Sequence, residues 1–241
     1  MTSDTFDRTG AGDRSVLRME RRYPHPLTKV WRAVTTPEHL AAWFPSQVSL
    51  DLRVDGELRF TGDPNLPDSG GRITDLEPPH VFAFTWIDDH IRFELAEDGD
   101  GTLFRLVHTF GDTAGAASFA SGWAACLQML AAVVAGEEPP RLTPGPAEHE
   151  RYVALFHLDQ GRVEPVDGVW RVTFERQLTQ PQEDVEKAIA TWPEGADRRL
   201  EEGTGHGPRL HLTTTAPTKA AADAAHDAWR ARIEDLAGRQ H

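Results

Sequence analysis

The sequence contains a single cysteine, Cys126, among its 241 residues. An intrachain disulfide therefore cannot form, and a zinc site built from several cysteines is excluded. One unpaired cysteine is typical of a protein from a reducing compartment. Cys126 lies on the apolar side of a predicted helix with no obvious base or cation beside it, so we expect an inert apolar filler.

Long apolar runs and positive charge are also scarce. No run approaches the roughly 18 apolar residues of a membrane span, and residues 1–14 lack the apolar core of a signal peptide. The formal net charge is −13, with 12 basic against 19 acidic side chains in residues 1–136 and 13 against 19 in the remainder. Neither half carries the basic surface that nucleic acids or anionic membranes require. The sequence predicts a soluble, cytoplasmic protein that binds neither.

Familiar catalytic and cofactor motifs are missing as well. The sequence has no HExxH, no Gly-x-Ser-x-Gly, no P-loop and no GxGxxG opening a helix. The histidines are scattered, and His206 and His211 are separated by Pro208, which is poor geometry for a metal ligand pair. We therefore expect no metal and no cofactor. Whether the protein is an enzyme stays open, with a non-catalytic role favoured.

Composition divides the chain into four parts. Residues 1–14 are polar and without periodicity, which predicts a flexible arm. Four prolines fall between Gly136 and Glu150, and proline blocks helix continuation, so residues 137–150 are expected to be a linker. A first domain over residues 15–136 and a smaller one over residues 151–241 are the predicted folded parts.

In the first domain, helical periodicity occupies the two ends and strand alternation the middle. A first strand precedes two short helices, one beginning at Pro26 and one after an N-cap at Thr36. Six strands are expected at 47–53, 56–61, 70–77, 81–87, 90–96 and 102–110, followed by an amphipathic helix over about 115–135. Only that helix is long enough to cover the apolar face of the sheet. The predicted fold is α+β, a helix-grip in which a curved antiparallel sheet wraps the long helix.

Five stretches in this order resemble the SRPBCC (START-like, Bet v-like helix-grip) superfamily, in the branch of activators of the heat-shock protein 90 ATPase. They are PLTKVWRAVT, PEHLAAWF, GGRITDLEPPHVFAFTW, LFRLVHTF and SGWAACLQML. The most specific pieces are the Pro-Pro turn before the strand that ends at Trp86, and the pair Gly122-Trp123. The resemblance implies a helix-grip fold that binds apolar or amphipathic small molecules or protein partners. It does not imply one activity.

Residues after the linker repeat part of the first domain. A shift of 155 residues places Val172 on Leu17, a shift of 106 places Trp229 on Trp123, and the difference of 49 is the length of the missing middle. This predicts a shortened second copy with a replacement hairpin over residues 151–166, the alternative being a generic βαβα module. A sheet this small leaves apolar side chains uncovered, so we expect docking on the first domain or on a second chain. The side chains concerned are Val172, Phe174, Leu210, Leu212, Trp229, Ile233 and Leu236.

Alternation on the strand over residues 102–110 places His108 on the side that faces the expected cavity. An imidazole there could donate to, or accept from, a ligand carbonyl or hydroxyl. The alternative is that His108 bonds a neighbouring strand or helix and never meets a ligand. The remaining candidates for lining the cavity are apolar: Trp43, Phe60, Phe84, Trp86, Phe93, Phe104, Leu106, Trp123, Leu127 and Leu130.

Three functions are compatible with these features. The favoured hypothesis is non-catalytic binding of an apolar or amphipathic small molecule between the sheet and the long helix. An enzyme of the polyketide cyclase or aromatase kind would use His108 as acid, base or orienting donor, but needs a second polar group that the sequence does not identify. A module similar to the chaperone activators would instead bind a protein partner, or form a homodimer through the second copy.

Overall fold

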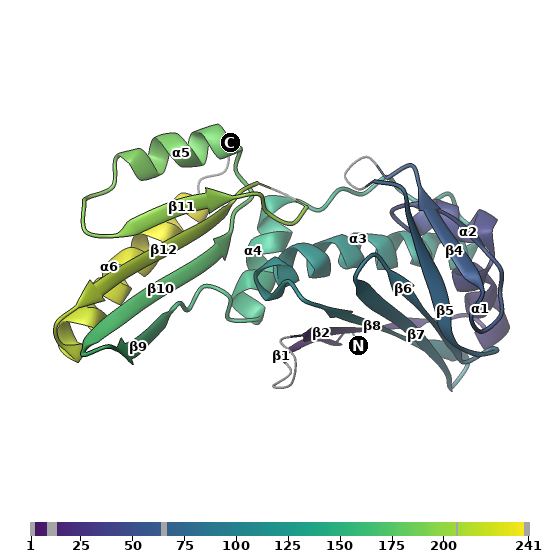
Figure 1. Cartoon of the computed structure of the whole chain (residues 1–241). Helices are drawn as coiled ribbons and strands as arrows, with labels where there is room; N and C mark the ends of the chain where they lie inside the picture. The colour runs from purple at the N-terminus through teal and green to yellow at the C-terminus, as the bar shows by residue number, and fades with distance from the viewer. Residues whose placement is uncertain (1–2, 9–13, 64–66, 206, 239–241) are drawn as a thin grey trace. The chain divides into compact units, whose positions relative to one another are not determined.

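The computed structural model of the chain describes residues 3–8, 14–63, 67–205 and 207–238. The chain divides into two compact units, each taken by itself below (Figure 1). One comprises residues 1–113 and 122–144, and the other residues 114–121 and 145–241. His206, considered above with His211 for metal binding, lies outside the described residues.

The first unit is built on an eight-stranded antiparallel sheet in the order β1-β2-β8-β7-β6-β5-β4-β3. All six strands expected in the middle of the domain are present, and the largest shift is at β3, which ends at Leu50 instead of residue 53. The strands are β1 (Ser3–Arg8), β2 (Ser15–Tyr23), β3 (Gln47–Leu50), β4 (Glu57–Thr61), β5 (Ser69–Glu77), β6 (Val81–Trp86), β7 (Asp89–Asp98) and β8 (Gly101–Phe110).

The strand β1 corrects the prediction of a flexible arm. Residues 3–8 pair antiparallel with β2, with Phe6 opposite Leu17. The Phe6 ring stacks on Phe110 with centroids 6.2 Å apart. These contacts join segments far apart in the chain, and the polar hexapeptide by itself carries too short an apolar pattern to predict a strand. The rest of the predicted arm, residues 1–2 and 9–13, lies outside the described residues.

The first unit also contains α1 (Leu27–Thr35), α2 (Pro37–Trp43) and most of α3 (Ala116–Ala135), whose residues 116–121 fall in the second unit. Proline stands directly before α1 and at the first position of α2, where its fixed φ suits a helix start. The Tyr23 hydroxyl on β2 donates to the Leu127 carbonyl of α3 at 3.1 Å, which ties helix to sheet. The expected α+β helix-grip arrangement is therefore confirmed.

The helix α3 is also apolar enough to be compared with a membrane span. Over Thr113–Ala135 an 18-residue window has a mean hydropathy of 1.5, and half of that window is buried. No other helix in the described ranges reaches this level. Leu127, Leu130 and Val134 are buried on one side of α3. A core helix of a folded domain meets the same criterion, and α3 is such a helix.

The second unit has a four-stranded antiparallel sheet in the order β11-β12-β10-β9. Its strands are β9 (Arg162–Val166), β10 (Val169–Gln177), β11 (Asp197–Glu201) and β12 (Arg209–Ala216), and its helices are α4 (Pro146–Leu155), α5 (Gln182–Ala190) and α6 (Lys219–Ala237).

Two predictions for this part of the chain are corrected by α4. The expected linker over residues 137–150 extends no further than Gly145, because Pro146 begins α4. The expected hairpin over residues 151–166 is instead the rest of α4 followed by the single strand β9, which pairs with β10. Tyr152 and Phe156 are four positions apart, and their rings pack with centroids 5.4 Å apart, which favours a helix here.

The expectation that the apolar side chains of the second unit are left uncovered is also wrong. Val172, Phe174, Leu210, Leu212, Trp229, Ile233 and Leu236 are all buried together in one cluster. The helix α5 contributes Val185 to the same cluster, and Trp192 after α5 lies 5.9 Å from Trp229 between ring centroids. The strand β11, which the sequence did not predict, widens the sheet. These elements cover the apolar face within the unit, so the reason for expecting it to dock elsewhere no longer holds.

Candidate functional site

Aromatic side chains on neighbouring strands line the covered face of the first sheet. The Phe93 ring on β7 lies 5.7 Å from Phe84 on β6, 5.4 Å from Phe104 on β8 and 5.9 Å from Trp43 on α2. All four residues are buried. Aromatic rings at such spacings attract one another, so this part of the domain is a packed core.

A second group of rings, here named the aromatic cluster, consists of Phe44, Phe60, Trp86 and Trp123. The Phe44 ring after α2 lies 5.0 Å from Trp86, 6.0 Å from Phe60 and 5.7 Å from Trp123. Phe60 on β4 and Trp86 on β6 are 5.5 Å apart. Three of the four residues are buried, whereas Trp86 is partly exposed. The aromatic cluster therefore reaches solvent at Trp86.

The indole nitrogens distinguish Trp86 from the other tryptophans of the domain interior. The Trp43 N–H donates to the Ala33 carbonyl at 2.9 Å, and the Trp123 N–H donates to His108 Nδ1 at 3.1 Å. Among the described residues, the Trp86 N–H has no protein acceptor. An indole packed on apolar rings normally finds a hydrogen-bond partner. The Trp86 N–H is thus available to a bound molecule or to water.

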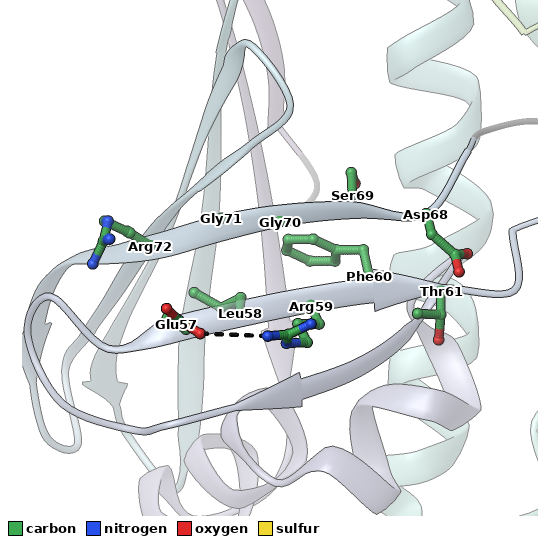
Figure 2. A pocket seen from close by; sticks show the side chains of 10 residues that line it. All are labelled: Glu57, Leu58, Arg59, Phe60, Thr61, Asp68, Ser69, Gly70, Gly71 and Arg72. Carbon is green, nitrogen blue, oxygen red and sulfur yellow. Dashed lines mark ion pairs between the residues drawn. The ribbon is translucent and has the colours of Figure 1, made fainter.

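A second polar group faces the same side of the sheet. Ser69 on β5 pairs directly with Phe60 on β4, and residues opposite one another on paired strands share a face. Figure 2 shows Phe60 and Ser69 on one side of these strands and Arg59 and Thr61 on the other. Ser69 is partly exposed, and its hydroxyl has no protein partner within the described ranges.

A hollow with a volume of about 460 Å³ lies along β4 and β5, lined by residues 57–61 and 68–72 (Figure 2). Phe60 and Ser69 are part of its lining, together with the exposed residues Arg59, Thr61 and Arg72. The two glycines of this lining, Gly70 and Gly71, have different surroundings. A Cβ on Gly71 would stand 2.0 Å from the Thr85 carbonyl oxygen, whereas a Cβ on Gly70 would meet nothing closer than 3.7 Å. Glycine is therefore required at position 71, where the backbones of β5 and β6 approach closely, but not at position 70.

His108 on β8 connects three elements. Because the indole N–H of Trp123 can only donate, Nδ1 of His108 must accept and carries no proton. The proton is therefore on Nε2, which donates to Asp89 Oδ2 at 2.9 Å. Asp89 in turn lies 3.6 Å from the Arg14 guanidinium. The imidazole thereby fixes α3 and β7 to β8.

Burial lowers the pKa of His108 below its ordinary value, although the hydrogen bond to Asp89 opposes this effect. The ring is accordingly neutral at pH 7. Both ring nitrogens are engaged by protein groups, which favours the alternative stated above, that His108 bonds neighbouring elements. Direct contact of His108 with a ligand stays a prediction.

The structure places ten of the eleven predicted lining residues in the buried interior, and Trp86 alone among them is partly exposed. Leu106, Leu127 and Leu130 belong to the packed core and Trp123 to the aromatic cluster. Burial raises the pKa of the Cys126 thiol to about 12, so the thiol is protonated at neutral pH.

Sequence reasoning missed Phe44 and Ser69. Phe44 follows Leu40 at helical spacing and could have been chosen on that basis, whereas nothing in the sequence sets Ser69 apart from other turn residues.

Residues 24–135 match the family model of the activator of Hsp90 ATPase homolog 1-like proteins. This match and the structural neighbours below support an SRPBCC-type, AHSA1-like fold for this part of the chain. The crystal structure of CalU16 from Micromonospora echinospora is 28% identical, with a TM-score of 0.53, and the match covers 64% of this chain and 94% of that one. A conserved protein of unknown function from Enterococcus faecalis is 25% identical, with a TM-score of 0.53, over 64% of this chain and 90% of that one. No curated protein sequence matches this chain.

The family match lies between residues 24 and 135 and does not extend into residues 145–241 of the second unit. Both structural neighbours are matched over nearly their whole length, yet the matches leave about a third of this chain outside. Their descriptions name no ligand or reaction. The shared fold supplies a scaffold, and the chemistry must be argued from the aromatic cluster and its polar neighbours.

Proposed function

We propose that the AHSA1-like domain binds a flat apolar or amphipathic small molecule, such as an aromatic polyketide or a sterol, at the aromatic cluster. The observation that supports this proposal is the packing and exposure of the Trp86 side chain. Its ring packs on Phe44 and Phe60, yet it is partly exposed and its N–H has no protein acceptor in the described structure. An apolar wall with few convergent donors is the usual composition of a small-molecule site.

The polar groups suggest what the ligand carries. Trp86 and Ser69 lie on adjacent strands, and both flank the Phe60 ring. The indole can only donate, and the serine hydroxyl can donate or accept. A carbonyl or hydroxyl oxygen at the edge of a flat ring system would satisfy the Trp86 N–H while the ligand rings pack on the exposed part of the indole. Each such hydrogen bond contributes about 0.5–1.5 kcal/mol to binding.

Binding is favoured over catalysis because the one acid–base candidate that the sequence offered is already engaged by protein groups. His108, the candidate for that role, is neutral, and its two nitrogens bond Trp123 and Asp89. Indole and serine can orient a substrate, but neither serves as a proton donor or acceptor near pH 7 without an activating base. A cyclase-like activity would need such a group from elsewhere.

Two fluorescent probes test the proposal on the full chain. Prodan is a flat naphthalene with a ketone, and N-phenyl-1-naphthylamine is an apolar aromatic molecule without a carbonyl. We expect both to bind the wild type. Trp86→Phe, which keeps a ring and removes the N–H, should weaken Prodan about five- to tenfold and N-phenyl-1-naphthylamine less than about twofold.

Trp170→Phe in the second unit is the control and should leave both affinities unchanged. A wild-type protein that binds neither probe at micromolar concentration would show that the proposal is wrong. If Trp86→Phe weakens both probes equally, the indole N–H does not bond the ketone of Prodan. That result would contradict this hydrogen bond but not the binding site.

A further inference from the structure

The connection between β6 and β7 contains an isoleucine in an unusual conformation. Trp86 pairs with Asp89, so Ile87 and Asp88 form a two-residue turn. Ile87 has φ of 55°, in the left-handed region that favours glycine, asparagine and aspartate. For a β-branched residue this conformation is a steric outlier. The turn is therefore strained at Ile87.

Burial within the chain does not compensate for that strain, because Ile87 is 49% exposed. The β9–β10 hairpin of the second unit has positive φ at both turn positions instead of the first alone, and it places residues there that tolerate it. Its turn between Val166 and Val169 is Asp167-Gly168, with φ of 50° and 84°. Among the described non-glycine residues with positive φ, Ile87 alone is β-branched.

The surroundings hold Ile87 in place. Trp86 before it is packed in the aromatic cluster, and Asp89 after the turn accepts from His108 at 2.9 Å. The Asp88 carbonyl accepts from Arg14 Nη2 at 2.7 Å. The turn is thus fixed from both sides, and the exposed Ile87 directly follows the partly exposed Trp86 in the chain.

We infer that Ile87 is a specificity-determining residue that contacts the ligand at the rim of the aromatic cluster. This inference rests on the proposed function. A strained apolar side chain beside a partly exposed indole extends the apolar wall outward, and bound ligand supplies the burial that the folded chain does not. The ligand class is accordingly a flat ring system with an apolar substituent that passes Trp86 toward solvent.

Ile87→Asn separates strain from contact, because asparagine adopts the left-handed conformation readily and lacks the apolar surface. In the full chain we expect a Tm increase of about 2–4 °C from relief of strain. We also expect Prodan affinity to fall about three- to fivefold from the lost apolar contact. Ile87→Val, which keeps both strain and apolar character, should change the affinity less than about twofold.

The matched control places isoleucine at the corresponding position of the other turn. Asp167→Ile should lower Tm and leave Prodan affinity unchanged. An Ile87→Asn variant with raised Tm and unaltered affinity would overturn the inference, and the proposed site would still stand if Trp86→Phe weakens Prodan. A lowered Tm of Ile87→Asn would show that Ile87 stabilises the fold, and this result would also overturn the inference. Failure of the wild type to bind either probe would defeat both proposals.

Discussion

Phe174 lies directly opposite Leu212 across β10 and β12, as Met19 lies opposite Leu106 across β2 and β8. The two shifts of 155 and 106 residues place Phe174 on Met19 and Leu212 on Leu106. The strand register of the second unit is therefore the register that the proposed repeat requires. Because a slip of one residue would move every side chain to the other face, this agreement is specific.

Two glycines at equivalent positions support the same relation. Under the shift of 106, Gly207 corresponds to Gly101. A Cβ on Gly101 would stand 2.5 Å from the Tyr23 carbonyl oxygen, and one on Gly207 would stand 2.0 Å from that of Gln180 and 3.1 Å from that of Leu178. Under the shift of 155, Leu178 falls on Tyr23 and Gln180 on His25, so the contact at the equivalent residue is the one at 3.1 Å. That the second unit is a shortened copy stays a prediction, now with structural support.

Phe174→Ala should destabilise the second unit through its own core. Its side chain is buried in the apolar cluster with Trp229, so truncation leaves a cavity that costs about 3–5 kcal/mol. Hydrogen exchange of the full chain should show the loss of protection concentrated in residues 169–216. Met19→Ala, the equivalent change in the first unit, is the control, and its effect should fall on β2 and β8. Unchanged protection in β10 and β12 of the Phe174 variant would contradict the described core.

Gly71→Ala and Gly70→Ala should differ sharply although the residues are adjacent. The methyl group added at position 71 would collide with the Thr85 carbonyl, and displacement of the strand should cost about 1–3 kcal/mol. The added methyl at position 70 meets only ordinary contacts, and the reduced freedom of the unfolded chain makes this change neutral or slightly stabilising. Urea denaturation measures both. Equal effects would show that β5 does not approach β6 as described.

Acid should destabilise the first unit through His108. Burial lowers its pKa in the folded chain below the value of 6.5 expected when unfolded, so the unfolded chain binds more protons just below that pH. The stability from neutral His108 is therefore fully present above about pH 6.5 and is lost as pH falls through the interval below it. Urea denaturation at pH 7.5 and pH 5.5 should show this decrease.

His108→Gln is the comparison, because glutamine cannot gain a proton in this range. Partial burial and Arg92 also lower the pKa of His90, which contributes in the same direction. The effect of His108 is therefore the difference between the wild type and the variant in the stability lost from pH 7.5 to pH 5.5. If the two proteins lose stability equally between these pH values, the burial of a neutral imidazole is not the cause.

The local pattern of the sequence determined most of the first unit. Alternation along β6 and β8 identified the face that carries Phe84, Trp86 and His108, and the spacing of three and four in residues 115–135 identified the helix that covers it. Turn residues marked the strand ends. These features depend on near neighbours in the chain, so they can be read without knowing the fold.

Only the tertiary structure decided how those side chains are used. The strand β1 depends on Phe6 meeting Phe110, and the neutral state of His108 depends on its burial, which outweighs the opposing effect of Asp89 on its pKa. Burial and hydrogen-bond partners are set by contacts between distant segments, which alternation and helical spacing do not encode. The partly exposed indole of Trp86 follows from the same cause. The sequence placed that indole on the inner face, and packing against residues brought from other elements left its edge and its N–H open.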